Sequence, residues 1–359
     1  MRIQAKATLA TIALLGSLVA SGAAANAAGS SVSGEGSSFA GGILTECIVD
    51  YNADTTANPN GDTIAYTPSS SGAGRGSFAA GTKAFGATDA PYADADTKPA
   101  DLLYVPLIGG PIAIAYKIPG IPSGLKLDAY VLGQILRGDI TTWSNAQIKK
   151  LNPTVTLPSE TIIVNYRSGS SGTTQNLVNW LIAGGAANWT SSGTWATATN
   201  KTSPVGNSEA NSAALVADTR LKNYSIGYAD LKDVNGKGLT FASIQNADGN
   251  FVQPSVNSSA AFLGQQTPAT NGVVDLKYGT KFAKSKVKSI AALAKTNYNL
   301  SLVTYGIAHN TAGAANKAVG SFFTYVIKSC APRLAGDLKY VALTGGLKTK
   351  SLELVAKVG

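Results

Sequence analysis

The sequence is poor in the side chains that bind transition metals. Among 359 residues there is one histidine, His309, and there are two cysteines, Cys47 and Cys330. A structural zinc site takes four Cys or His ligands at short, regular spacings. The chain offers too few ligands for a zinc or iron site, so we expect no metal and no cofactor.

Long apolar runs are also missing after the first thirty residues. The chain begins with a basic stretch, residues 7–20 are mostly apolar, and small residues follow. This order predicts a secretory signal peptide over residues 1–28, cleaved near Ala27 or Ala28. No later run is long enough to span a bilayer, and no cysteine at the cleavage site could carry a lipid. We therefore expect a soluble protein in a periplasm or outside the cell.

Acidic residues are fewer than basic ones, with 20 Asp and Glu against 29 Lys and Arg. The formal charge is +9, and it falls to about +7 without Arg2 and Lys6 of the leader. The lysines are scattered and aromatic residues are not interleaved with them. A basic exterior can steer any anion inward, nucleic acid included. Since no nucleic-acid recognition motif is present and the chain is predicted to be exported, we expect no nucleic-acid partner.

The two cysteines would meet an oxidising compartment after export. Sequence cannot give the distance between Cys47 and Cys330, so a disulfide and two buried thiols both remain open. A bridge would close a long loop, and the chain-entropy estimate is then roughly 5 kcal/mol. The oxidising compartment favours the bridge.

The stretch from Tyr166 to Thr174 has the composition of an anion site. Arg167 is followed by a run of Ser, Gly and Thr, with an apolar β-branched run before it and a helical pattern after it. A strand, a turn of small residues and a helix start leave backbone N–H groups beside a guanidinium. Serine and threonine hydroxyls can donate to the same anion, and arginine matches phosphate-like geometry. The alternative is an ordinary loop with a Ser171 or Thr173 N-cap and a solvated arginine.

Similar turns recur earlier in the chain. Residues 62–67 predict a strand that leads into the serines and glycines of 69–76. Residues 34–39 supply Gly, Ser and Phe before a helical pattern, and their serines stand where the N-cap of that helix is expected. Neither turn has the terminal Gly-Lys-Ser/Thr of a nucleoside triphosphatase or the third glycine of a dinucleotide site. We therefore expect neither nucleotide class.

Asp89 ends a short apolar strand at residues 84–88, before Pro91. It could cap the turn that follows. Beside a bound oxyanion, a carboxylate repels the ligand unless the anion carries a proton that the carboxylate can accept. Asp89 would then select hydrogen phosphate over fully ionised sulfate.

Strands alternate with helices along the whole chain, which indicates an α/β fold with mainly parallel strands. Gly109-Gly110-Pro111 separates two apolar runs and marks either a turn or a hinge between domains. Residues 138–143 predict the start of a short helix. In such folds ligands sit outside the carboxyl ends of the strands, where the three polar signals fall.

With these motifs in place, the chain resembles the periplasmic phosphate-binding proteins of high-affinity phosphate ABC transporters. The resemblance covers nearly all of the mature chain. Its most specific piece is Phe85-Gly86-Ala87-Thr88-Asp89-Ala90-Pro91, and the resemblance rests on the order and spacing of this and other pieces, among them Gly138-Asp139-Ile140-Thr141-Thr142-Trp143 and the Arg167–Thr174 stretch. It implies a monomeric two-domain clamp of the type II periplasmic binding proteins, with residues 29–109 plus 300–359 in one domain and 110–299 in the other. Each domain would be a mainly parallel sheet flanked by helices, with hinge strands between them.

The resemblance also implies the site and the partners. Inorganic phosphate would lie in the cleft, be captured by hinge closure and pass to the permease subunits of an ABC transporter. Asp89 would accept the phosphate proton and Arg167 would supply the positive charge. The remaining contacts would be hydroxyl or backbone N–H groups from three helix starts: Ser38, Phe39, Ser70, Ser171, Gly172 and Thr173. Within residues 69–71 the resemblance favours Ser70, with Ser69 and Ser71 as the neighbouring alternatives.

One position departs from the family pattern. Such proteins often carry an acid two residues after the arginine, where it pairs with that arginine, and here the residue is Gly169. Arg167 would then be less neutralised. We expect a stronger dependence of phosphate affinity on salt and looser discrimination between phosphate protonation states.

Two other functions stay open at this point. A secreted phosphatase or other hydrolase could use the same anion pocket, although the sequence lacks a metal cluster, paired catalytic carboxylates and a Gly-Xaa-Ser-Xaa-Gly elbow. A Ser-His-Asp arrangement would have to use His309. Hydrolysis of a substrate analogue that is lost on Ser38→Ala would favour the enzyme. A clamp for sulfate, molybdate or arsenate is the other alternative.

Overall fold

The computed structural model describes residues 29–359. The predicted signal peptide, residues 1–28 with its cleavage site near Ala27 or Ala28, lies outside the described residues. Over 29–359, no helix has both the length and the apolar character that crossing a membrane requires.

One ten-stranded sheet runs through the molecule, with most strands in the order β2-β1-β3-β12-β4-β8-β6-β7. Its strands are β1 (Ser31–Gly36), β2 (Thr63–Pro68), β3 (Phe85–Thr88), β4 (Leu102–Lys117), β6 (Ile163–Arg167), β7 (Asn207–Glu209), β8 (Ser225–Asp230), β9 (Thr240–Phe241), β12 (Ser301–His309) and β13 (Val341–Ala342). A smaller sheet joins β11 (Phe251–Val252), β10 (Ser243–Gln245) and β5 (Lys126–Leu127).

Strand direction changes across the large sheet. β1 pairs in parallel with β2 and β3 at one end, and β6 pairs in parallel with β7 and β8 at the other. The central strands β12 and β4 are antiparallel to each other, β12 is antiparallel to β3, and β4 is antiparallel to β8. Parallel pairing therefore prevails within each end, and two antiparallel strands connect the ends.

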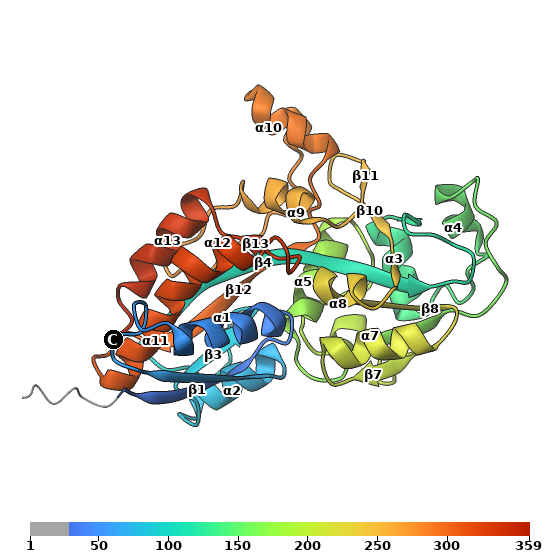
Figure 1. Ribbon diagram of the computed structural model, residues 1–359. Coiled ribbons are helices and arrows are strands. Elements are labelled where there is room, and N and C mark those ends of the chain that lie inside the picture. The colour runs from blue at the N-terminus through green and yellow to red at the C-terminus, as the bar shows by residue number, and fades with distance from the viewer. Residues whose placement is uncertain (1–28) are drawn as a thin grey trace, which may run out of the picture.

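β4 passes straight through Gly109-Gly110-Pro111, so the turn considered for this stretch is wrong. Gly109 and Gly110 pair with Val303 and Leu302 of β12, and Ile112 pairs with Asp230 of β8. Nearly all of β4 is buried, as expected for a central strand covered on both faces. The strand thus belongs to both ends of the sheet (Figure 1).

Helices cover both ends of the sheet. Around the β1–β3 end lie α1 (Gly41–Ala53), α2 (Ser71–Ala79), α11 (Ala314–Tyr325), η3 (Val326–Cys330), α12 (Ala331–Leu334) and α13 (Gly345–Val355). Around the β6–β8 end lie α3 (Ala129–Arg137), α4 (Ala146–Leu151), α5 (Gly172–Ala183), α6 (Trp195–Thr199), α7 (Ser212–Leu221) and α8 (Leu231–Asn235). The remaining helical segments are α9 (Val256–Leu263), η1 (Phe282–Lys284), α10 (Lys288–Ala292) and η2 (Leu293–Lys295).

Two helix starts differ from the sequence prediction. The N-cap of α1 is Ala40, and the Ser37 hydroxyl instead accepts from the Ala40 N–H. The short helix expected within residues 138–143 begins only at α4, where Asn145 is the N-cap. Polar residues at 139–142 have other partners: Asp139, for instance, forms an ion pair with Arg137.

Cys47 and Cys330 form a disulfide, with their Cα atoms 5.6 Å apart. It links the buried face of α1 to the end of η3, and both side chains are fully buried. The bridge joins residues 283 positions apart, so it connects the first helix of the chain to its last quarter.

Candidate functional site

The predicted site residues meet where the two ends of the sheet face each other. Ser37 and Ser38 follow β1, Asp89 follows β3, and Arg167 ends β6. Because β2, β1 and β3 are parallel, their carboxyl ends lie along one edge. The residues contributed by β6 and α5 approach this edge from the other end of the sheet: Arg167 Nη1 lies 3.1 Å from Ser38 Oγ, and Thr173 Oγ1 lies 3.2 Å from Asp89 Oδ2.

Asp89 lies at the centre of a ring of hydroxyl donors and is 3% exposed. Ser37 Oγ and Thr304 Oγ1 donate to its Oδ1 at 2.6 and 2.7 Å, and Thr173 Oγ1 donates to its Oδ2. Burial raises the pKa of the carboxyl above its ordinary value, while these hydroxyls and the Arg167 charge act in the opposite direction. The turn-capping role considered for Asp89 is not what its carboxylate does here.

Two of these donors were not among the predicted site residues. Ser37 stands beside Ser38 in the same small-residue turn, so the sequence located it to within one place. Thr304 lies within β12, where one polar residue interrupts a buried apolar run. A fully buried threonine in a strand is a weak signal, and its partner, 215 positions away, appears only in the fold.

Arg167 reaches from β6 to the loops that follow the other strands, and it is 2% exposed. Its Nη2 donates to the carbonyl of Ser69 at 3.2 Å and to that of Ala210 at 3.1 Å. Its Nε has no hydrogen-bond partner among the described residues. Burial lowers the pKa of the guanidinium, and the nearby Tyr228 and Asp89 act against that shift. A buried cation with an unused donor suits an anionic ligand.

Three helix N-termini point at the same region. Ser70 caps α2 by accepting from the Ala73 N–H, and Ser171 caps α5 by accepting from the Thr174 N–H. Both residues are therefore N-caps, as the alternative interpretation of the Arg167 stretch held for Ser171. A hydroxyl that accepts from the helix can still donate outward. The third helix is α7, whose first residue, Ser212, has its Oγ 3.1 Å from Ser38 Oγ.

The Phe39 side chain is in the core, so only the backbone of this residue is left to serve a site. The ring is fully buried and packs edge-on against Tyr340 with centroids 5.8 Å apart. The Tyr340 hydroxyl donates to the Phe39 carbonyl at 2.8 Å. Gly172 allows close packing: a Cβ there would lie 2.6 Å from Ser71 Oγ and 2.8 Å from the Asp89 Cβ. Any larger residue at 172 would push α5 away from Asp89.

Two stacked aromatic rings lie next to Arg167. Trp195 of α6 stacks on Tyr228 of β8 with ring centroids 5.6 Å apart. The Tyr228 hydroxyl accepts from the Arg167 N–H and lies 2.6 Å from Thr174 Oγ1. Tyr228 therefore contacts both the arginine and the first turn of α5.

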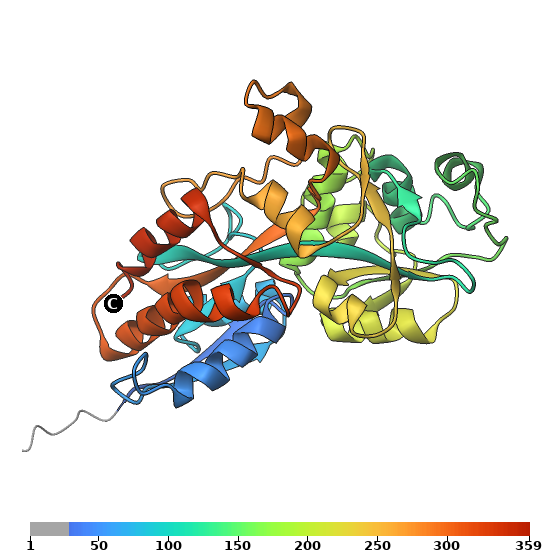
Figure 2. The same cartoon turned by 45° about the horizontal axis from the view of Figure 1, so that its top comes forward.

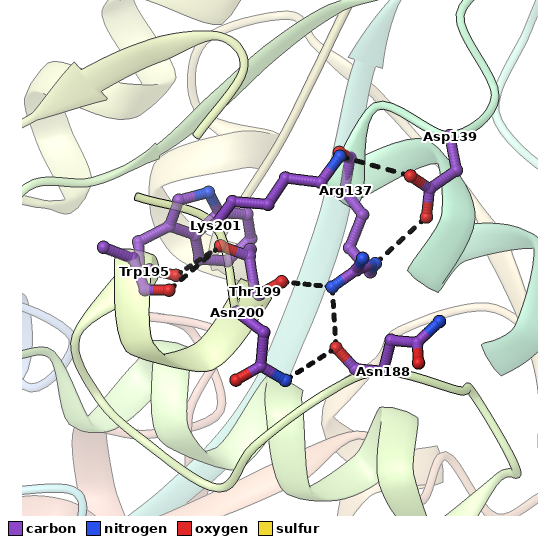
Figure 3. A network of polar contacts seen from close by, with 8 residues as sticks. Arg137, Asp139, Asn188, Trp195, Thr199, Asn200 and Lys201 are labelled. Atoms are coloured by element: carbon purple, nitrogen blue, oxygen red, sulfur yellow. Dashed lines mark hydrogen bonds and ion pairs between the residues drawn. The ribbon is translucent and has the colours of Figure 1, made fainter. Parts of the chain in front are cut away.

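A polar network holds α6 in this place (Figure 3). Arg137, in the last turn of α3, donates to the carbonyls of Asn188 and Thr199, and its Nε donates to Asp139 at 3.0 Å. Lys201 donates to the Arg137 carbonyl and to Asp139. Figure 3 shows these side chains joining Arg137, at the end of α3, to Asn188 before α6 and to Thr199 and Lys201 at the end of α6.

Asp230, at the end of β8, is a second buried carboxylate. Its Oδ1 caps α8 by accepting from the Asp233 N–H, and its Oδ2 has no partner among the described residues. Burial and the Asp233 charge raise the pKa of Asp230 well above its ordinary value. A raised folded-state pKa means that stability is lost as the pH rises through it.

Asp230→Asn should therefore raise the free energy of unfolding at neutral pH by about 1–3 kcal/mol, because asparagine caps a helix as well and carries no buried charge. The gain should shrink as the pH falls toward the ordinary carboxyl range, where wild-type Asp230 is protonated. Urea unfolding at neutral and acid pH measures both effects. Asp128→Asn, the same change at the half-buried N-cap of α3, is the matched control and should change little. A gain that does not vary with pH would contradict the charge explanation.

His309 lies away from the residues of the site. Its Nδ1 is 2.8 Å from Asp101, and its ring packs on Phe78 with centroids 4.4 Å apart. A serine nucleophile paired with this histidine, as the hydrolase alternative required, is not what these contacts form.

Comparison with known proteins places the chain in a family. A sequence profile of the PBP superfamily domain matches residues 21–329. The chain belongs to the PBP superfamily. Among curated members, the phosphate-binding protein PstS of Haemophilus influenzae is 32% identical over 237 residues, which make up 64% of this chain and 67% of that protein. PstS of Xylella fastidiosa is 32% identical over 231 residues, 64% of this chain and 61% of the relative.

Solved structures of the superfamily share the fold at low sequence identity. The phosphate-bound high-affinity periplasmic phosphate-binding protein PfluDING has a TM-score of 0.66 at 18% identity, covering 89% of this chain and 92% of its own. A phosphate-binding protein from Stenotrophomonas maltophilia has a TM-score of 0.65 at 15% identity, covering 90% and 93%. The predicted α/β clamp fold of the two-domain periplasmic binding proteins and the family resemblance are confirmed.

Proposed function

We propose that this protein captures inorganic phosphate in the cleft between its two lobes and delivers it to the permease of an ABC transporter. The observation that carries the proposal is the meeting of Asp89, Arg167 and three helix N-termini from both ends of the sheet. A buried carboxylate facing a buried guanidinium across hydroxyl donors suits an oxyanion that carries both negative charge and a proton. The two curated relatives described above are named as phosphate-binding proteins, which supports the same ligand.

The lobes are proposed as residues 29–109 plus 300–359 and residues 110–299. β4 and β12 support this division, since they are the strands that join the two parallel ends of the sheet. Ser38, Ser70 and Asp89 would then belong to the first lobe, and Arg167 and the start of α5 to the second. Closure around phosphate would bring the two sets together, and release would separate them.

Within the cleft, Arg167 would offer its free Nε and its Nη groups to the phosphate, and Asp89 would accept the phosphate proton. Hydroxyl and N–H groups would come from the turn before α1 and from the starts of α2 and α5: Ser38, Phe39, Ser70, Ser171, Gly172 and Thr173. We also propose that the leader sends the protein across the membrane to the periplasm or beyond. Catalysis has no part in this proposal.

Titration calorimetry of the purified protein with phosphate, arsenate and sulfate tests the function. Phosphate and arsenate should bind and compete, since both carry a proton at neutral pH, whereas sulfate should bind far more weakly. Sulfate binding as tight as phosphate binding would overturn the proposal.

Asp89→Asn should weaken phosphate binding and reduce the preference for phosphate over sulfate. The amide cannot act as a charged acceptor for the phosphate proton, and it can donate a hydrogen bond to sulfate. Wild-type affinity should also fall in acid as Asp89 protonates, at a pH above the ordinary aspartate range because burial raises its pKa. The variant should lack this acid-side loss. Asp54→Asn, at an exposed turn remote from the site, controls for loss of one carboxylate. An unchanged anion ranking in Asp89→Asn would remove Asp89 from this role.

The Gly169→Asp variant tests the effect of restoring the acid that the family often carries two residues after the arginine. A Cβ at Gly169 meets only Ser70 Oγ, at 3.9 Å, so a side chain fits. The added carboxylate should neutralise Arg167 and flatten the dependence of phosphate affinity on ionic strength. Gly169→Asn, of equal size and without charge, is the control. Equal salt slopes for wild type and both variants would contradict the hypothesis.

A further inference from the structure

A lysine-rich segment projects from the body of the protein. Residues 281–295, here called the lysine protrusion, comprise η1, α10 and η2 and stand out at the top of Figures 1 and 2, in orange. None of the residues of α10 is buried. The base is fixed: the Asp248 carboxylate accepts from the N–H groups of Phe282 and Ala283, both at 3.0 Å, and the Phe282 ring is buried against Phe262.

The protrusion is positively charged without nearby compensation. All of its lysines are exposed: Lys281, Lys284, Lys286, Lys288 and Lys295. None of these lysines forms an ion pair with any residue of the described chain. The sequence contains no acidic residue from 276 to 336. Asp248 lies at the base, and Asp275, the first acid before the protrusion in the sequence, pairs with Lys277.

The kind of side chain narrows the partner. Specific protein interfaces are enriched in arginine and aromatic residues and depleted in lysine, and the protrusion has no arginine. Lysine acts as a point charge without fixed geometry. The aromatic residues of this region, Tyr278, Phe282 and Tyr298, are all buried and cannot stack on nucleic-acid bases. These features favour a diffuse anionic surface.

An exposed apolar side chain lies among the charges. Val287 is 53% exposed between Lys286 and Lys288, and Ile290 and Leu293 are half-buried. Lysines that surround aliphatic side chains are typical of segments that lie at a membrane interface. We propose that the lysine protrusion docks the protein onto a membrane surface rich in anionic phospholipid, with the lysines among the headgroups and Val287 at the acyl boundary.

Co-sedimentation with lipid vesicles tests the proposal. The full protein should bind vesicles of phosphatidylcholine mixed with phosphatidylglycerol and not vesicles of phosphatidylcholine alone, and added salt should weaken the binding. Replacing Lys281, Lys284, Lys286 and Lys288 with Gln should lower the vesicle partition coefficient at least about tenfold, since several surface charges act together. The matched control replaces four exposed lysines elsewhere, Lys98, Lys149, Lys150 and Lys237, with Gln. This control variant should keep most of the vesicle binding.

A reporter variant locates the contact. In Val287→Trp, the new indole should shift its emission to shorter wavelength only with anionic vesicles, and the four native tryptophans are buried and should respond little. Equal losses in the two lysine variants, equal binding to both vesicle types, or no emission shift on bound vesicles would each overturn the proposal. So would tighter binding to single-stranded DNA or to an acidic protein than to anionic vesicles at the same salt.

Discussion

Arg167→Ala should weaken phosphate binding by about 2–5 kcal/mol, which is a loss of roughly 30-fold to several thousand-fold in affinity. The guanidinium is the one cation in the described chain that contacts Ser38 and the Ser69 carbonyl, and it is 2% exposed. Its removal takes away an opposite charge that a buried anion beside Asp89 needs. Titration calorimetry with phosphate measures the loss.

Two comparison variants make this result specific. Arg167→Lys keeps the charge without the planar fork, so its affinity should fall between those of wild type and Arg167→Ala. Arg333→Ala removes an exposed arginine that pairs with Asp50 and should leave binding unchanged. Near-wild-type affinity in Arg167→Ala, with the thermal midpoint intact, would show that the ligand lies elsewhere.

Removal of the Cys47–Cys330 disulfide should destabilise the folded protein by about 5 kcal/mol, because the bridge closes a loop between residues 283 positions apart. For a chain of this size the thermal midpoint should fall by roughly 5–15 °C. The double variant Cys47→Ala/Cys330→Ala, followed by circular dichroism on heating, measures the change.

The single variants separate the bridge from packing. Both cysteines are fully buried, so each alanine also removes a sulfur from the core. If the covalent link dominates, each single variant should lose nearly as much stability as the double variant. Wild type under reducing conditions should then lose a similar amount. Additive single losses, with no effect of reductant, would assign the stability to packing instead.

Local features of the site could be predicted because they depend on short-range geometry. Ser70 and Ser171 each accept from an N–H three residues ahead, which is a contact that any strand, turn and helix start can form. The same reasoning placed Asp89 and Arg167 at strand ends. It misplaced the N-cap of α1. In the sequence, Ser37 and Ser38 look equally suited to cap this helix, but the N-cap is Ala40.

Long-range partners could not be predicted in this way. Thr304 and Thr173 reach Asp89 from positions 215 and 84 residues away, and only the pairing of β12 between β3 and β4 brings Thr304 there. Gly109-Gly110-Pro111 has the composition of a turn, yet β12 pairs with all three residues, and β8 pairs with β4 from Ile112 onward. Tertiary hydrogen bonding overrode the local preference for a turn.

The order of residues thus determined the α/β class and the polar turns that end the strands, and it predicted an anion site at those turns, because hydrophobic spacing and capping act within a few residues. The fold alone decided that Ser37, Thr304 and Thr173 surround one carboxylate and that Cys47 reaches Cys330. It also decided that a continuous β4 connects the two ends of the sheet. These contacts depend on strand register and on the packing of distant segments. Both are set by interactions across the whole sheet, so no single stretch of sequence determines them.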